Sequence, residues 1–216
     1  MNIAVILSGC GNRDGSELQE TLSLLLAIDR RGWRYQCFAP EGQFTVVSHL
    51  DNSENDSPRS LLAESARIAR GDIKPLARYR ADDFDALALP GGMGAARNLS
   101  TYAFDGDAMT VRPDVEQAIH ATYSQHKPVL AMCIAPMVLA KVLGRYGVSL
   151  TLGQDNPAAQ AAARLGAKVQ HCGVEDVCID REHRIYTTPA YMVGTRISEI
   201  FAGAENMVAA LERDCR

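Results

Sequence analysis

One cysteine, Cys133, lies directly between an apolar segment and a helical one. Val129–Met132 is entirely apolar and predicts a buried strand, and Ala135–Leu143 predicts a helix with Pro136 in its first turn. Such a tight corner projects its side chain from the sheet edge, as in a nucleophile elbow, although the glycines of G-x-S-x-G are absent. Unpaired N–H groups at the helix start favour a thiolate, so the pattern predicts a lowered pKa and a nucleophilic Cys133. A buried structural cysteine has the same local pattern.

A glycine-rich loop, Pro90–Gly94, follows another apolar run, Asp85–Leu89. Because glycine lets backbone N–H groups approach a substrate closely, Gly91 and Gly92, helped by the N–H of Ile134, are candidate donors of an oxyanion hole. The loop lacks the G-K-[ST] ending of a phosphate-binding P-loop. A plain tight turn is the alternative interpretation.

A third polar loop follows the first apolar run and ends at Glu17, which falls in the first turn of a predicted helix with Ser16 as its N-cap. Acids are common in first helical turns because of the helix dipole, so Glu17 alone carries little information. Asp14 is interpreted as a loop or capping residue. Cys10 is a candidate accessory residue, either as a resolving thiol or as packing.

No histidine has a context that supports a Cys–His relay, and no cluster of residues has the spacing of metal ligands. The six cysteines form no C-x-x-C pair, which argues against a zinc ribbon or a thioredoxin motif. The sequence therefore predicts no metal site.

Strands that alternate with helices predict an α/β fold with a mostly parallel sheet, whose functional crevice lies beyond the carboxyl ends of the strands. This rule brings the three loops to one edge. Leucines recur at helical spacing from Leu18 to Leu26, and Val177–Asp180 with Arg184–Thr187 predicts a hairpin. Glu41–Leu76 is less regular, and we expect it to be a small insertion that decorates the sheet.

The chain has 216 residues, of which 47% are hydrophobic and 22% charged, which predicts one globular domain over residues 1–216. The net charge of −4 argues against a nucleic-acid partner. No apolar run reaches the ~18 residues of a membrane span. Met1–Leu7 lacks a basic leader, so a cytoplasmic protein is expected.

Four segments in this order resemble the ElbB family, the isoprenoid biosynthesis glyoxalases also called enhancing lycopene biosynthesis or sigma cross-reacting proteins. They belong to the PfpI-like branch of the class I glutamine amidotransferase-like superfamily. The resemblance spans nearly the whole chain, and its motifs lie in four segments: Ser8–Glu17, Leu89–Ser100, Met132–Pro136 and Thr187–Met192.

The resemblance implies a flavodoxin-like three-layer sandwich, a nucleophile at Cys133, an acid at Glu17 and a homodimer. Asn98 lies within the second motif and is a candidate accessory residue. The implied activity is a cofactor-independent glyoxalase that converts glyoxal or methylglyoxal to glycolate or lactate. Relatives often carry His directly after the cysteine, where this chain has Ile134, so an efficient proton shuttle is missing from the pattern.

Two alternatives to a glyoxalase acting on a small dicarbonyl or aldehyde remain. An exposed thiol of low pKa also suits a redox sensor, in which Glu17 would hydrogen-bond oxidised Cys133. A regulatory module that binds a metabolite in the same pocket, without efficient catalysis, is the other.

Overall fold

The computed structural model describes residues 1–215, and of Asp56 only the backbone. A seven-stranded sheet forms its centre, with β10 antiparallel to β11 and the other neighbours parallel. The α/β fold with a mostly parallel sheet is thereby confirmed. In spatial order the strands are β10 (Cys178–Asp180), β11 (Ile185–Thr188), β7 (Val129–Met132), β6 (Ala86–Leu89), β1 (Asn2–Ile6), β2 (Arg34–Ala39) and β5 (Ile73–Pro75).

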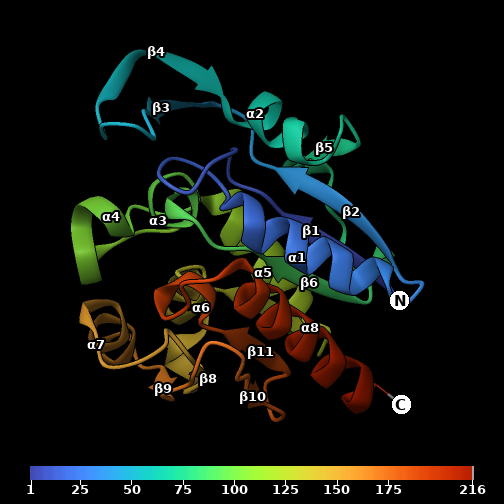
Figure 1. The fold of residues 1–216 in the computed structure, drawn as a ribbon. Coiled ribbons are helices and arrows are strands. Elements are labelled where there is room, and N and C mark those ends of the chain that lie inside the picture. The colour runs from blue at the N-terminus through green and yellow to red at the C-terminus, as the bar shows by residue number, and fades with distance from the viewer. Residues whose placement is uncertain (216) are drawn as a thin grey trace.

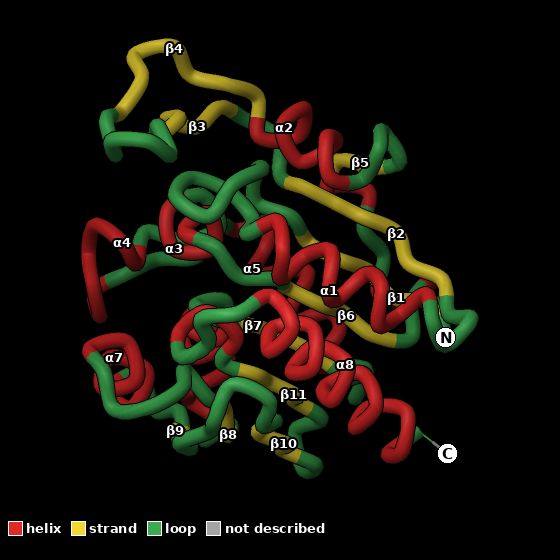
Figure 2. Tube along the Cα trace, in the orientation of Figure 1, coloured by secondary structure: helices red, strands yellow, loops and turns green. Residues whose placement is uncertain are grey.

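Helices cover both faces of this sheet, in three layers (Figure 1). On one face α1 and α8 pack against each other and α2 lies beside α1, whereas α5 and α6 pack on the opposite face (Figures 1 and 2). Smaller helices lie along the edge near the loops. The helices are α1 (Leu18–Asp29), α2 (Leu61–Ile68), α3 (Met93–Arg97), α4 (Tyr102–Asp105), α5 (Pro113–Ser124), α6 (Pro136–Leu143), α7 (Pro157–Arg164) and α8 (Ile197–Asp214).

The central strands β6 and β7 are buried at every position, as expected for parallel strands covered on both faces. Their carboxyl ends, with those of β1 and β11 on either side, lie at one edge of the sheet. This edge carries the three loops singled out above and also the segment that follows β11. The sheet therefore brings together four segments that are far apart in the sequence.

The expected insertion is smaller than Glu41–Leu76. Two antiparallel strands form a hairpin that extends away from the main sheet, β3 (Gln43–Val47) and β4 (Glu54–Ser60) (Figure 1). After it, α2 returns the chain to β5, which pairs in parallel with β2. Only the hairpin decorates the fold, because α2 and β5 form an ordinary crossover and edge strand. A further two-stranded ribbon is made by β8 (Ser149–Leu150) and β9 (Lys168–Val169).

Candidate active site

Cys133 occupies a sharp corner between β7 and α6. Its φ is 58°, a left-handed conformation that costs a non-glycine residue on the order of 1–3 kcal/mol and that concentrates at functional sites. The corner is held because the Cys133 N–H donates to the Thr188 carbonyl at 3.0 Å, and Pro136 opens α6 as predicted. The backbone conformation alone thus sets the direction in which the thiol points.

The thiol itself is almost fully buried, with 8% of Cys133 exposed. Burial, followed by the facing Glu20 carboxyl, raises the pKa of Cys133 well above its usual value, while the N–H groups of Gly92 and Ile134 act in the opposite direction. The prediction of a lowered thiol pKa is therefore wrong. Two backbone donors at a helix start do not outweigh desolvation and a neighbouring carboxylate.

Glu20, in the first turn of α1, is the acid that interacts with this thiol. Its side chain is fully buried, and burial raises its pKa to about 7 against the opposing effects of Cys133 and of the Tyr191 and Gly91 N–H groups. The Tyr191 N–H donates to Glu20 Oε1 at 3.2 Å. A carboxyl group poised near neutrality beside a thiol can accept the thiol proton.

Gly91 makes the approach of these two groups possible. A Cβ atom at this position would lie 2.3 Å from Cys133 Cβ and 2.5 Å from Glu20 Oε2, so no larger residue fits between them. The Gly91 N–H donates to the Glu20 carboxyl, and the Gly91 carbonyl accepts from the Glu17 N–H at 3.0 Å. Of the three candidate oxyanion donors, Gly92 and Ile134 thus face the sulfur, and Gly91 supports the acid.

Glu17 has a different place from the one predicted. It is the N-cap of α1, and its Oε2 accepts from the Glu20 N–H at 2.6 Å. Ser16, the predicted cap, instead accepts from the Ser8 N–H through its hydroxyl at 2.9 Å. Glu17 still lines the pocket over Cys133, and burial raises its pKa. The acid with the dominant effect on the thiol is therefore Glu20, one helical turn further on.

A pocket of about 470 Å³ opens over Cys133 and the two acids. Its walls come from the three predicted loops, from the starts of α1, α4 and α7, and from the segment after β11. No Lys, Arg or His lines it, so it suits an uncharged ligand with apolar parts. Besides Glu17, Glu20, Cys133, Gly92 and Ile134, the lining residues are Asn12, Met93, Tyr102, Asn156, Pro157, Ala158, Tyr191 and Met192.

The two candidate accessory residues lie outside this pocket. Cys10 lines a separate cavity that shares no lining residue with this pocket, so a role as resolving thiol for Cys133 has no support. Asn98 donates through Nδ2 to the carbonyls of Ser8 and Asp14, at 2.8 and 2.6 Å. It acts as a positioning residue that ties the first loop to the second.

The interpretation of the sequence missed Glu20, although a signal for it exists. Glu20, Leu24, Ala27 and Ile28 are spaced as the buried stripe of a helix, and all four are buried in α1. An acid in such a stripe is costly unless it is paired or neutralised, which is typical of a functional residue.

Within residues 1–215, no group of three or more His, Cys, Asp or Glu side chains is arranged to hold a metal ion. None of the helices over the same range combines the length and apolarity needed to cross a membrane.

Comparison with known proteins identifies the chain's relatives. No protein-family model matches it. The rat "ES1 protein homolog, mitochondrial" is 40% identical over 95% of this chain and 81% of its own length. The human "Glutamine amidotransferase-like class 1 domain-containing protein 3, mitochondrial" is 40% identical over 95% of the chain and 80% of its length. The chain belongs to the ES1 family of glutamine amidotransferase-like proteins.

Solved structures share the fold of this chain. An isoprenoid biosynthesis protein with an amidotransferase-like domain from Ehrlichia chaffeensis has a TM-score of 0.93, with 32% identity and full coverage of both chains. A DJ-1 superfamily protein from Salmonella typhimurium shares the fold at a TM-score of 0.61 and 20% identity, over 99% of this chain and 91% of its own. The mammalian ES1 relatives are named mitochondrial, so a cytoplasmic location for this chain stays a prediction.

Proposed function

We propose that this ES1-family protein is a cofactor-independent glyoxalase of the ElbB type, in which Cys133 is the nucleophile and Glu20 the base. The observation that supports the proposal most is the buried Cys133–Glu20 pair beneath a pocket without cationic residues. In this pair the Cys133 sulfur carries a proton, and the neighbouring Glu20 carboxyl has a pKa of about 7. This arrangement lets the thiol lose its proton only as it adds to a carbonyl.

The reaction follows from this proton balance. Glu20 takes the Cys133 proton as sulfur bonds to the aldehyde carbon of an α-oxoaldehyde, and the N–H groups of Gly92 and Ile134 stabilise the oxyanion. Glu20 then gives this same proton to the oxyanion, which yields the hemithioacetal and leaves Glu20 ionised. Glu20 next removes the proton from that carbon, which gives an enediol once the neighbouring carbonyl oxygen is protonated. Glu20 then returns the proton to the neighbouring carbon as the hydroxyl on the sulfur-bearing carbon loses its own proton, which yields a 2-hydroxy thioester. Water hydrolyses the thioester to a 2-hydroxy acid and restores the thiol.

Glu20 also supplies the proton shuttle that the sequence pattern lacked. With Ile134 after the nucleophile, no imidazole is available at that position. A carboxyl group with a pKa near neutrality is suited to move protons in both directions. The burial and raised pKa of Cys133 favour an addition in which Glu20 takes the thiol proton over peroxide sensing, which needs an accessible thiolate.

The test is conversion of methylglyoxal to lactate by the purified chain, measured by enzymatic assay of the product. Cys133→Ala is expected to abolish the reaction and Glu20→Gln to reduce it by about 10²-fold or more. Glu17→Gln is the matched control, because a Gln side chain can still accept from the Glu20 N–H. Full activity in Cys133→Ala, or equal losses in the two Glu variants, would contradict the proposal.

A homodimer is part of the same proposal. The leucines Leu18, Leu22 and Leu26 of α1 are between 41% and 52% exposed, and Ile197 of α8 is 58% exposed. Leu22, Leu26 and Ile197, together with Phe201, border an apolar groove between α1 and α8. This α1–α8 face is the surface that we assign to the dimer contact, since contiguous exposed apolar groups mark interaction sites.

A further inference from the structure

The pocket over Cys133 is much larger than methylglyoxal, the simplest substrate of the proposed reaction. Its volume is about 470 Å³. If each non-hydrogen atom takes at most the ~30 Å³ share of a water molecule, methylglyoxal fills no more than about 150 Å³ and leaves roughly 300 Å³. Pockets of about 300–1,000 Å³ bury most of a drug-sized ligand, so this one has room for a substrate about three times larger than methylglyoxal.

The part of the pocket beyond the reacting carbonyl has apolar walls. The aldehyde carbon must lie against the Cys133 sulfur, so a group on the neighbouring carbon extends along the rest of the lining. Four separate segments supply the apolar side chains there: Met93 of α3, Tyr102 of α4, Pro157 and Ala158 of α7, and Met192 after β11. These walls favour an apolar group, because contact removes apolar surface of both partners from water.

The wall formed by α4 and α7 is built by contacts within the protein. Helix α7 packs against the turn Gly106–Ala108, which directly follows α4 (Figure 1). An ion pair between Asp107 of this turn and Arg164 of α7 joins the two segments. At the pocket, Ala158 is only 6% exposed, so it packs against its neighbours as part of a closed wall. A wall that exists before the ligand binds lowers the cost of ordering it.

The charges of the pocket disfavour an anionic group on the substrate. Glu17 and Glu20 both line it, whereas no Lys, Arg or His does so among residues 1–215. A carboxylate or phosphate group on the substrate would find no cation to pair with and would lie near two carboxyl groups. Burial of an unpaired charge is costly, so the pocket selects a neutral group.

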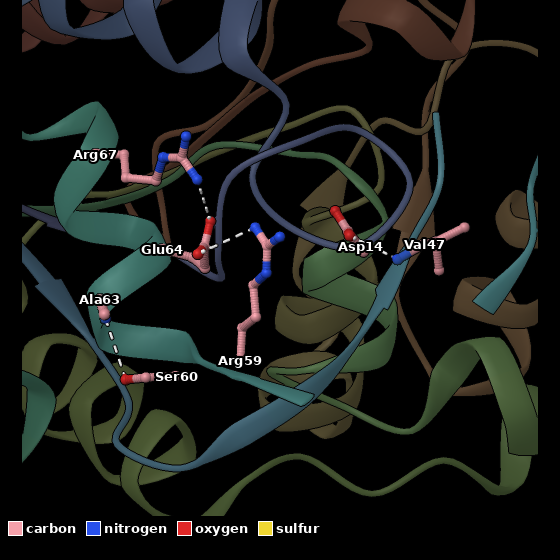
Figure 3. A network of polar contacts seen from close by, with 7 residues as sticks. All are labelled: Asp14, Val47, Arg59, Ser60, Ala63, Glu64 and Arg67. Atoms are coloured by element: carbon pink, nitrogen blue, oxygen red, sulfur yellow. Dashed lines mark hydrogen bonds and ion pairs between the residues drawn. The ribbon is translucent and has the colours of Figure 1, made fainter. Parts of the chain in front are cut away.

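A smaller cavity, of about 200 Å³ between the β3–β4 hairpin and the loop after β1, has a different lining. Its charged side chains contact groups of the protein itself: Glu64 accepts from Arg59 and Arg67, and Asp14 accepts from a backbone N–H of β3 (Figure 3). The cavity shares no lining residue with the pocket over Cys133. Of these two cavities, the pocket over Cys133 is therefore the one whose walls match a neutral apolar group.

We propose that the substrate is an α-oxoaldehyde whose ketone carbon carries a neutral apolar group of about the size of a phenyl ring. This inference rests on the proposed glyoxalase function and adds what the pocket selects. The aldehyde meets Cys133, and the apolar group lies against the wall that contains Met93 and Ala158. The balance of the reaction is unchanged, since phenylglyoxal and one water give mandelate and a proton. Contacts remote from the reacting carbon can lower the barrier, so methylglyoxal is a truncated substrate that loses turnover.

The test compares phenylglyoxal with methylglyoxal on the purified full chain, with mandelate and lactate measured by chromatography. The kcat/KM for phenylglyoxal is expected to be at least about tenfold higher. Ala158→Leu fills part of the wall and should lower this ratio by about tenfold, because methylglyoxal still fits. Ala163→Leu, at an exposed residue of the same helix outside the pocket, is the matched control and should leave the ratio unchanged. Met93→Ala, at a residue 38% exposed and so of little risk to the fold, should also lower the ratio.

Isothermal titration with 2-hydroxyacetophenone and hydroxyacetone, which carry an alcohol in place of the aldehyde, measures the same selection without turnover. The aromatic compound is expected to bind at least about tenfold more tightly, and Ala158→Leu should remove this preference. If neither aldehyde is converted, the glyoxalase function is wrong, and tighter binding of the aromatic compound would still support selection of a neutral apolar group. If methylglyoxal is converted at least as efficiently as phenylglyoxal, or if Ala158→Leu changes neither the ratio nor the binding preference, the inference is overturned while the glyoxalase function stands.

Discussion

The buried acid Glu20 makes the stability of this protein depend on pH in a direction that can be tested. Its pKa is about 7 in the folded protein and 4.5 in an unperturbed chain. Between these values the folded protein holds a proton that the unfolded chain has released, so the free energy of unfolding falls as the pH rises. Replacing Glu20 by Gln removes this titration and keeps the shape of the side chain.

The size of the effect follows from the shift. A difference of roughly 2.5 pKa units, at 1.36 kcal/mol for each unit, corresponds to about 3 kcal/mol. The free energy of unfolding of the natural chain should therefore fall by about 3 kcal/mol relative to that of Glu20→Gln between pH 4.5 and about pH 8, with most of the change below pH 7. The free energy of unfolding of Glu20→Gln minus that of the natural chain is therefore expected to be about 3 kcal/mol larger at pH 8 than at pH 4.5.

Urea denaturation at several pH values, followed by circular dichroism, measures this difference. Glu41→Gln is the control, because Glu41 is exposed and its side chain has no partner within the described residues. The comparison with Glu20→Gln cancels the titration of groups common to both chains. A stability difference that stays flat from pH 4.5 to 8, or that grows in favour of the natural chain, would refute a buried Glu20 with a raised pKa.

Three further changes test the site and the surface. Gly91→Ala places a Cβ 2.3 Å from Cys133 Cβ, so it should destabilise the fold by about 1–3 kcal/mol in urea denaturation and abolish turnover, whereas unchanged values would contradict the packing. Glu17→Ala removes the N-cap of α1 and should cost about 1 kcal/mol, which Glu17→Gln should largely restore in the same assay. Leu22→Glu puts a charge on the exposed α1–α8 face and should convert a dimer to a monomer in sedimentation, and an unchanged sedimentation coefficient would exclude this face.

The local features of the site could be predicted from the sequence because each depends on neighbours in the chain. An apolar run that meets a proline-started helix at Cys133 specifies the corner, and Gly91–Gly92 after a buried strand specifies a close backbone approach. The alternation of strands and helices fixed a mostly parallel sheet, and that sheet brings the loops to one edge. The β10–β11 hairpin was likewise readable from its two short runs and turn.

The identity of the acid was decided by tertiary packing. Glu17 and Glu20 are one turn apart, and which of them meets the thiol depends on how α1 is rotated and where it begins. The leucines at positions 18, 22 and 26 suggest one inner face, yet they are exposed, and the stripe that contains Glu20 and Leu24 is buried. Packing against α8 and the sheet sets this rotation. The hydrophobic spacing within α1 alone is compatible with burial of either stripe.

The pKa of Cys133 likewise depends on local sequence for one part and on tertiary packing for the other. The sequence by itself determined a cysteine at a helix start, where backbone donors lower a thiol pKa. Only the folded chain determined that the sulfur is buried against Glu20, and these two effects raise the pKa because desolvation and a facing carboxylate both disfavour the thiolate. Local order in the chain fixes which groups lie at the sheet edge, whereas solvent exclusion and charge proximity exist only after residues distant in sequence have come together.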